Sequence, residues 1–377
     1  MASILFCTFR DKKVMFISFF IKVYMSFRIF SFIVLMFFVL KTLTAQDPHF
    51  TQYYSNPLYL NPATSGTYSG TFRVSMLYRD QYFQPLEESY KTFAASGDVK
   101  LDIRNAKKGL NDVISMGLTF VSDRVRVFDV NTNQLLLTLA YHKALDKKYK
   151  QTLGIGFQGG LLQRAVNYEN LNFQDQFNAI NGFTLPSSEF LPPNNITVPD
   201  LSTGIYYSAS PTKKLNLHMG IGYQHFTQPN VSYYDDPVIL NENIVKTSKY
   251  PSRLTFHGGL QFMTSYRLDI SPRFIWLQQG GKQTIQLSSL FRIKFAERTG
   301  QYFHVGPMFR IVQDVTGTNL ETMAAMVGIE RKNFIIGLSY DWGLGSVILD
   351  GRNFSTLELS LMYIGEHDND TNFCPQF

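Results

Sequence analysis

Apolar and polar residues alternate with a period of two along most of this 377-residue chain, and this alternation constrains the fold more than any other feature. One apolar face holds Phe72, Val74, Met76 and Tyr78, and the opposite face holds Arg73, Ser75 and Arg79. This period is that of a β-strand with one apolar and one polar face. After residue 45, no uninterrupted apolar run is long enough to cross a bilayer as a helix. The alternation therefore predicts an all-β protein.

Soluble antiparallel sandwiches alternate as well, so the polar face has to decide where the sheet lies. A transmembrane strand needs about 9–11 residues, and its polar face tolerates small, amide and charged residues because it lines a lumen. Residues 152–164 meet this requirement, with glycine and glutamine on one side and leucine, isoleucine and phenylalanine on the other. We therefore expect an outer-membrane antiparallel β-barrel whose apolar side faces lipid.

About 14 segments carry the strand pattern, an even number that suits a closed barrel. They cover residues 71–79, 90–103, 112–122, 132–145, 150–163, 200–210, 214–227, 252–263, 266–278, 283–296, 301–313, 321–331, 332–342 and 354–364. Several odd-numbered connections are long and most even-numbered ones are tight, as in barrels with long external loops and short periplasmic turns. The odd connection at 279–281 is tight and the even connection 104–111 is long, against this rule.

Residues 25–45 have the layout of a secretory signal peptide. Arg28 precedes an apolar run from Ile29 to Leu40, and Ala45 stands before Gln46. A membrane anchor is the alternative, although the run falls short of the about 20 residues that a spanning helix needs. We expect a leader at 1–45, an N-terminal segment at 46–70, one barrel at 71–364 and a tail at 365–377.

Charge and cysteine content exclude two classes of site. The leader contains six of the 35 basic residues and one of the 29 acidic residues, so the remaining chain is nearly neutral. A nucleic-acid partner, which requires a basic face, is therefore not expected. Cys7 lies in the leader and Cys374 in the tail, which leaves no partner for an internal disulfide or a thiolate metal site.

No catalytic motif is present. The chain lacks a Gly-x-Ser-x-Gly elbow and a His-Glu-x-x-His helix, so no enzyme, cofactor or metal site is expected. The acidic clusters Asp235-Asp236 and Asp368-Asn369-Asp370 lack the glycine of a calcium loop and read as solvated loops. Five histidines on predicted strands read as lumen or interface residues rather than catalytic groups: His142, His218, His225, His257 and His304.

The N-terminal segment differs in kind from the strands. Pro48, Pro57 and Pro62 cannot donate to a sheet ladder, and asparagine and tyrosine residues between them can satisfy an irregular backbone inside a polar lumen. A disordered periplasmic lead-in is the alternative, but the segment holds much apolar surface for a solvated tail. We expect a plug or docking segment.

The same segment carries a dense sequence signature. Asp47-Pro48-His49-Phe50, Gln52-Tyr53-Tyr54, Asn56-Pro57 and Leu60-Asn61-Pro62-Ala63 resemble the mature N-terminus of the PorP/SprF family of type IX secretion membrane proteins of Bacteroidota. Weaker resemblance continues through Tyr78-Arg79-Asp80-Gln81-Tyr82 and Ile336-Gly337-Leu338-Ser339-Tyr340-Asp341. Residues 355–359 depart from the family, which often has Gly-Ser-His-Glu-Ile there.

The resemblance implies an outer-membrane component or accessory of the type IX secretion system. Such a protein supports secretion or cell-surface attachment of a large partner of the gliding or adhesin type. Implied partners are a secreted protein with a type IX C-terminal domain, other type IX secretion components and outer-membrane lipid. A porin-like outer-membrane solute channel remains the alternative. Residues expected to bind the partner or form a plug are Phe50, Tyr53, Tyr54, Asn56, Pro57, Tyr59, Asn61, Pro62, Arg73 and Arg79.

Overall fold

The computed structural model describes residues 47–83, 89–105, 110–125, 129–146, 150–168, 171–188, 191–233, 248–296, 300–314, 317–344 and 354–366. The expected leader, the tail after residue 366 with Cys374, and the acidic residues Asp235, Asp236, Asp368 and Asp370 lie outside the described residues.

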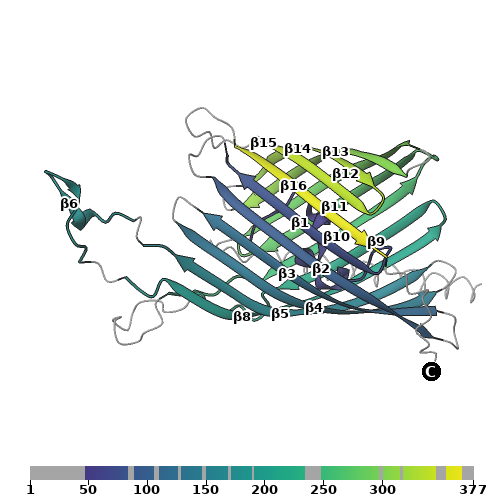
Figure 1. The fold of residues 1–377 in the computed structure, drawn as a ribbon, viewed down its shortest axis with the longest axis horizontal. Coiled ribbons are helices and arrows are strands. Elements are labelled where there is room, and N and C mark those ends of the chain that lie inside the picture. The colour runs from purple at the N-terminus through teal and green to yellow at the C-terminus, as the bar shows by residue number, and fades with distance from the viewer. Residues whose placement is uncertain are drawn as a thin grey trace, which may run out of the picture. The chain divides into compact units, whose positions relative to one another are not determined.

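Fourteen antiparallel strands close into one barrel, which confirms the predicted fold class (Figure 1). In chain order the strands are β1 (Phe72–Gln81), β2 (Tyr90–Asn105), β3 (Leu110–Val125), β4 (Val130–Asp146), β5 (Gln151–Val166), β8 (Asn195–Thr212), β9 (Leu215–Gln224), β10 (Arg253–Met263), β11 (Leu268–Gln279), β12 (Lys282–Ala296), β13 (Gln301–Asp314), β14 (Gly317–Arg331), β15 (Phe334–Gly343) and β16 (Ser355–Gly365). Each strand pairs with its neighbours in this order, and β1 closes the ring against β16.

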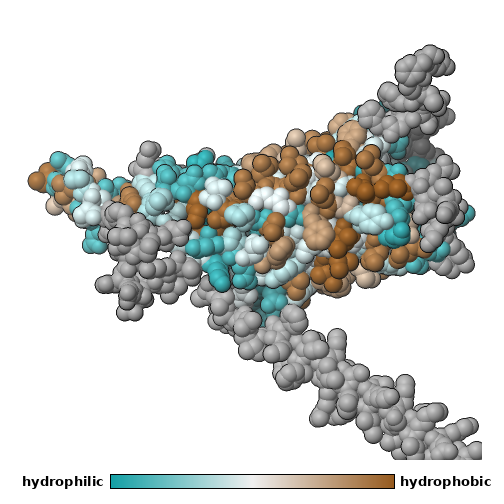
Figure 2. Space-filling view, turned by 90° about the horizontal axis from the view of Figure 1, so that it is seen from below, coloured by the Kyte–Doolittle hydropathy of each residue, from teal (hydrophilic) through white to brown (hydrophobic). Residues whose placement is uncertain are grey.

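The alternation seen in the sequence becomes the two faces of the wall. On β1, Val74 and Met76 are 41% and 45% exposed, whereas Arg73 and Ser75 are 6% and 1% exposed. A soluble sandwich would reverse this arrangement, because its apolar face is buried. Figure 2 shows apolar side chains gathered over the barrel wall and hydrophilic ones towards one end. The inward face is therefore polar and the outward face apolar, as in a transmembrane barrel.

Most strand ends differ from the predicted positions by one to three residues, and the starts of β8 and β14 differ by more. β8 begins at Asn195 instead of residue 200, β14 begins at Gly317 instead of 321, and β9 ends at Gln224 instead of 227. The added β8 residues pair with β5, as in Asn195 with Ala165. Ladder pairing needs no alternation where a strand extends past an apolar belt, so the hydropathy pattern could not locate these ends.

The connections differ strongly in length at the two ends of the barrel. The longest ones, 167–194 and 225–252, are both odd-numbered and therefore lie at the same end, which we call the long-loop end. Connection 167–194 holds a small hairpin of β6 (Phe177–Asn178) and β7 (Gly182–Phe183) after the short helix η4 (Gln174–Gln176). The turns at the other end are mostly tight, such as the one between Arg331 and Phe334.

The N-terminal segment, residues 47–70 in the structure, folds into three short helical turns before β1 begins. These are η1 (Tyr53–Ser55), α2 (Pro57–Leu60) and η2 (Pro62–Thr64). None of the helices in the described residues is long and apolar enough to span a membrane. The segment lies within the ring of strands, drawn in purple behind β1 and β2 in Figure 1.

Candidate functional site

Proline and asparagine shape the N-terminal segment. Pro57 is the first residue of α2 and Pro62 the first of η2, positions where a missing N–H loses no helical bond. The Asn61 side chain accepts a hydrogen bond from Ala63 N at 2.9 Å and so caps η2. Such short turns leave many backbone groups unpaired, and inside a barrel these must find partners on the wall.

The first attachment point is a buried cluster around Asp47. Its Oδ2 lies 2.9 Å from His225 Nε2 and 3.0 Å from Arg253 Nη1. His225 Nδ1 reaches Asp200 Oδ2 at 2.8 Å, and the Tyr250 hydroxyl donates to Asp47 Oδ1. All five residues are at most 5% exposed, so each charge depends on the others for compensation. The cluster fixes one end of the segment.

Titration of this cluster follows from its charges. Burial raises the pKa of the Asp47 carboxyl, but His225 and Arg253 outweigh burial and hold that pKa well below 3.8. Burial lowers the pKa of the His225 imidazole, but its two carboxylate partners raise it to about 9. His225 is therefore an imidazolium at neutral pH, with both ring nitrogens donating. It follows the last residue of β9 with a φ of 53° rather than lying on a strand as predicted.

Glu358 of β16 forms the second attachment point. Its two carboxylate oxygens accept the backbone N–H groups of Thr51 and Gln52, each at 2.9 Å. Glu358 is fully buried, and Arg79 Nε of β1 lies 3.3 Å from its Oε1. The Thr51 hydroxyl donates to Asp341 Oδ2 at 2.6 Å. One buried carboxylate thus satisfies two successive amides of an irregular backbone.

Asn61 forms the third attachment point, against β8–β10. Its Nδ2 lies 3.0 Å from the Ile205 carbonyl oxygen and 3.1 Å from His257 Nε2. The wall comes close here because it lacks side chains. A Cβ at Gly204 would overlap Asn61 Oδ1, and a Cβ at Gly156 would overlap the backbone of Pro62 and Ala63. Glycine in these strands therefore lets the segment's backbone approach the wall.

Asp98 of β2 holds the last part of the segment. Its carboxylate accepts Gly66 N and both Nε and Nη2 of Arg73, all at 2.9 Å. The Tyr68 hydroxyl donates to the Asp98 carbonyl oxygen at 2.8 Å, and His142 Nε2 donates to the Ser65 carbonyl oxygen at 2.7 Å. The segment is therefore bonded to the wall at several points between Asp47 and Tyr68.

Aromatic side chains fill the space between these attachment points. Phe50 and Tyr59 pack edge to face at 5.8 Å and join Leu77, an inward residue of β1. The Arg253 guanidinium lies 4.4 Å from the Tyr59 ring centroid, and that of Arg273 lies 4.5 Å from the Tyr54 ring centroid. Packing of a guanidinium over an aromatic face is favourable and helps bury the charge.

All ten residues predicted from the sequence lie in or against the N-terminal segment. Eight belong to it, and Arg73 and Arg79 reach it from the inward face of β1 through Asp98 and Glu358. Asn56 is buried but, within the described part of the chain, neither of its side-chain amide atoms has a hydrogen-bond partner. The five histidines are inward residues of the wall or its rim. The side chains of His142, His225 and His257 are at most 4% exposed.

Sequence reasoning missed the wall residues that hold the segment. These are the inward or rim residues Asp98, Gln224, Tyr250, Arg253, Gln286, Arg310, Asp341 and Glu358. Asp200 was missed as well, and it acts through its contact with His225. The available signal was a charged residue on the polar face of a strand, since a charge inside a barrel needs a partner. Among the described residues, no group of three or more His, Cys, Asp or Glu side chains could hold a metal ion.

A comparison with protein families gives one match, which covers most of the chain. Residues 42–363 match the family described as "Type IX secretion system membrane protein PorP/SprF". No curated protein matches this chain at the sequence level.

Several solved structures resemble this chain in backbone arrangement at low sequence identity. The TodX monoaromatic hydrocarbon channel deltaS2 mutant is 10% identical, with a TM-score of 0.48 over 82% of this chain and 93% of that chain. A Pseudomonas aeruginosa FadL homologue is 13% identical, with a TM-score of 0.46 over 82% and 94%. The Ralstonia pickettii toluene transporter TbuX is 11% identical, with a TM-score of 0.45 over 83% and 94%.

Proposed function

The chain belongs to the PorP/SprF family of type IX secretion system membrane proteins, and from this premise we propose that it is an outer-membrane barrel that supports secretion or cell-surface attachment of a large partner protein. The partner is a secreted protein with a type IX C-terminal domain, of the gliding or adhesin type. Other type IX secretion components and outer-membrane lipid are its further contacts. It carries out no catalysis in this role.

The outer membrane is the location that the wall supports best. In the described residues, each strand of the closed ladder pairs with two neighbours, as a wall in lipid requires, and the outward side chains of the strands are largely aliphatic and aromatic. Export through the proposed signal peptide at residues 1–45 would deliver the remaining chain to this membrane. In this proposal the exported chain consists of an N-terminal segment at 46–70, a barrel at 71–364 and a tail at 365–377.

One observation carries the functional proposal: the N-terminal segment is hydrogen-bonded to inward side chains around the barrel. Its partners come from β2, β10, β12, β13, β15 and β16, with Asp98, Arg253 and Glu358 among them. A solute channel would require an open lumen, whereas a lumen occupied by such a segment suits a protein that holds or docks a partner.

The segment also has a direction. Gly70 precedes β1 at the short-turn end, whereas Asp47 contacts His225 and Tyr250 of the long connection 225–252. In outer-membrane barrels, the long loops face the cell exterior. The beginning of the segment therefore lies towards the cell surface, where an exported partner would be retained.

Deletion of residues 47–63 tests the proposal. Because no residue of this segment belongs to the closed ladder of strands, we expect the deleted protein to reach the outer membrane and keep its heat-modifiable migration. Surface display or secretion of the partner should be lost, measured by antibody binding to intact cells. Normal partner display at normal barrel levels would refute the proposal. The same strain expressing a Gly97→Ala variant serves as the insertion control, because Gly97 faces outward and a Cβ there makes only an ordinary contact with Arg73 O at 3.8 Å.

A further inference from the structure

β2 extends past the start of its neighbour β1 at the short-turn end of the barrel. The last pair between the two strands joins Phe72 to Val99, whereas β2 continues beyond that pair. Thr71 adds one more bond, because its carbonyl oxygen accepts the Lys100 N–H at 3.0 Å. Residues 101–105, which we call the free edge of β2, pair in the described residues only with β3 on the other side.

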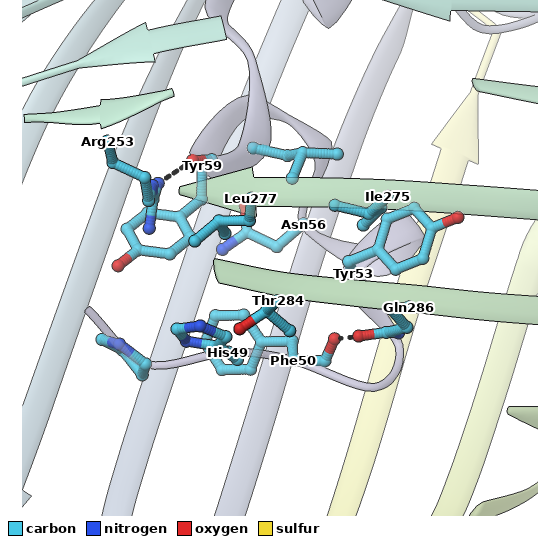
Figure 3. Close-up of a pocket in the computed structure, with 12 residues that line it drawn as sticks. His49, Phe50, Tyr53, Asn56, Tyr59, Arg253, Ile275, Leu277, Thr284 and Gln286 are labelled. Carbon is cyan, nitrogen blue, oxygen red and sulfur yellow. Dashed lines mark hydrogen bonds between the residues drawn. The ribbon is translucent and has the colours of Figure 1, made fainter. Parts of the chain in front are cut away.

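The N-terminal segment does not cover this edge, because it runs inside the lumen. There, Arg253 donates to the Tyr59 carbonyl oxygen and Gln286 donates to the Phe50 carbonyl oxygen (Figure 3). The chain leaves the line of β1 at Gly70, where φ is 133°. Any strand that pairs with the free edge must therefore come from another stretch of polypeptide.

The free edge presents backbone groups that can bind such a strand. Successive residues of a strand point their N–H and C=O groups to opposite sides, and the Lys100 N–H points towards β1. The N–H and C=O groups of Asp102 and Arg104 therefore point the same way, where no described strand pairs with them. Leu101 and Ile103 are 68% and 44% exposed, so the apolar outward face of β2 continues along this edge. Unpaired backbone groups beside an apolar face are costly next to lipid and invite another strand.

β16 brings the chain after Gly365 to the same place. Gly365, the last residue of β16, pairs with Phe72, and Phe72 pairs with Val99 of β2 on its other side. β16 and β2 are both antiparallel to β1, so they run in the same direction. Two residues of extended chain reach about 7 Å, whereas neighbouring strands lie about 4.8 Å apart. The chain after Gly365 can therefore move over by one strand spacing and lie beside the free edge.

The charges of the two stretches are opposite. Residues 366–371 read Glu-His-Asp-Asn-Asp-Thr, so acidic residues stand at every second position, as on one face of a strand. Residues 100–108 contain one acidic residue, Asp102, and four basic residues: Lys100, Arg104, Lys107 and Lys108. The formal charge is −3 on the first stretch and +3 on the second. Opposite charges on paired strands stabilise the pairing.

We propose that residues 367–372 of the tail add a parallel strand to the free edge of β2. Counted from the pair of Gly365 with Phe72, Asp370 comes level with Arg104. The main-chain groups of the edge supply the hydrogen bonds, and the opposite charges select this stretch of the tail. The tail thereby closes an edge that would otherwise be open to pairing with other chains.

Hydrogen exchange of the purified full-length protein tests the proposal. We expect the amides of Asp102 and Arg104 to be protected in this protein and to exchange at least about tenfold faster in a variant that ends at Glu366. The amide of Asp98, which pairs with Arg73 of β1, is the control within the same strand and should be unchanged. Equal exchange at Asp102 and Arg104 in the two proteins, whether fast or slow, would overturn the proposal, because the tail would then not cover the edge.

Charge variants test the same contact without shortening the chain. Asp368→Lys combined with Asp370→Lys replaces the attraction to the basic stretch of β2 with repulsion, so exchange at Asp102 and Arg104 should be faster than in the wild type. Asn369→Lys is the matched control, because position 369 falls on the opposite face of the added strand, and exchange should stay slow. If the double variant exchanges no faster than Asn369→Lys, charge does not hold the tail at this edge and the proposal fails.

Discussion

The wall and the N-terminal segment are held in place by different kinds of interaction. Each wall strand has two faces whose residue types alternate, and lipid outside together with a polar interior selects the register. The segment has no such repeat, and its position depends on individual partners such as Glu358, Asp98 and Asp47. A periodic element tolerates many substitutions of like polarity. An irregular one should fail when a single partner is removed.

Glu358→Gln is the change that separates the two regions most strongly. The new amide nitrogen cannot accept a hydrogen bond from Thr51 or Gln52, and Arg79 loses its buried carboxylate. Removing one partner of a buried pair costs about 3–5 kcal/mol. We expect faster cleavage of the segment by chymotrypsin while the barrel still migrates as a folded band.

Glu330→Gln is the matched control for that variant. Glu330 is also a wall carboxylate, but it pairs with Arg292 and His304 rather than with the segment. Its loss should leave the cleavage rate of the segment unchanged. Equal cleavage in both variants would show that the contact with Glu358 does not hold the segment.

Arginine substitutions test the wall itself. Leu287 is 46% exposed on the outward face, and a charge there near the membrane midplane costs about 2–4 kcal/mol. Asn216→Arg places the same side chain on the inward face of a different strand, β9, where a charge costs less free energy. We expect lower yields of folded barrel for Leu287→Arg than for Asn216→Arg, measured by heat-modifiable migration. Equal yields would mean that the faces of the wall are assigned wrongly.

Gly156→Ala should produce a smaller effect confined to the segment. A Cβ at this position overlaps the backbone of Pro62 and Ala63, and overpacking of this kind costs about 1–3 kcal/mol. Gly97→Ala adds the same methyl group at an outward site with ordinary contacts. Chymotrypsin should cleave the segment faster in the first variant only. Unchanged cleavage in Gly156→Ala would mean that the segment does not lie against β5.

Raising the pH should give the smallest effect, because it removes one proton and leaves every side chain in place. The pKa of His225 is raised to about 9 by Asp47 and Asp200, against the opposing effect of burial. The stabilisation that charged His225 gives to the attached segment is complete below about pH 6.5 and is lost as the pH rises through 9. Arg253 stays charged, and burial raises the pKa of Tyr250 well above 10, so that hydroxyl stays protonated.

The contribution of Asp47 changes at the other end of the pH scale. The pKa of the Asp47 carboxyl is lowered, so the stabilisation that its charge gives to the attached segment is present above about pH 4 and is lost only in strong acid. Between pH 7 and 10 it is His225 that loses its proton, so cleavage of the segment should accelerate over this range in the wild type. It should change little over this range in a His225→Gln variant. An identical pH response in both proteins would show that another group controls the segment.

The comparison also explains which parts of the structure could be predicted from the sequence. The repeat of Phe72, Val74 and Met76 predicts the outward face of β1, and similar repeats give fourteen strands and their order. The positions of Asn195 and Gly317 at strand starts could not be predicted, because pairing continues there without alternation.

The segment could be predicted as a set of residues but not as a set of contacts. Its prolines, tyrosines and asparagines distinguish it from the strands, and Arg73 and Arg79 were correctly placed on an inward face. Their partners Asp98 and Glu358 are respectively 25 and 279 positions away in sequence, so only closure of the barrel brings the latter close. His225 illustrates the same limit, because its role depends on Asp47 and Asp200 meeting at the long-loop end.

Ion conductance in planar bilayers tests most directly whether the N-terminal segment closes the lumen. Full-length protein and a variant lacking residues 47–63 would be reconstituted at equal amounts and compared at the same voltage. Because the segment is bonded to inward side chains of several strands, the full-length protein should conduct little, and the deletion should open a stable ohmic channel. Equal, high conductance from both proteins would contradict the account and support a solute channel instead.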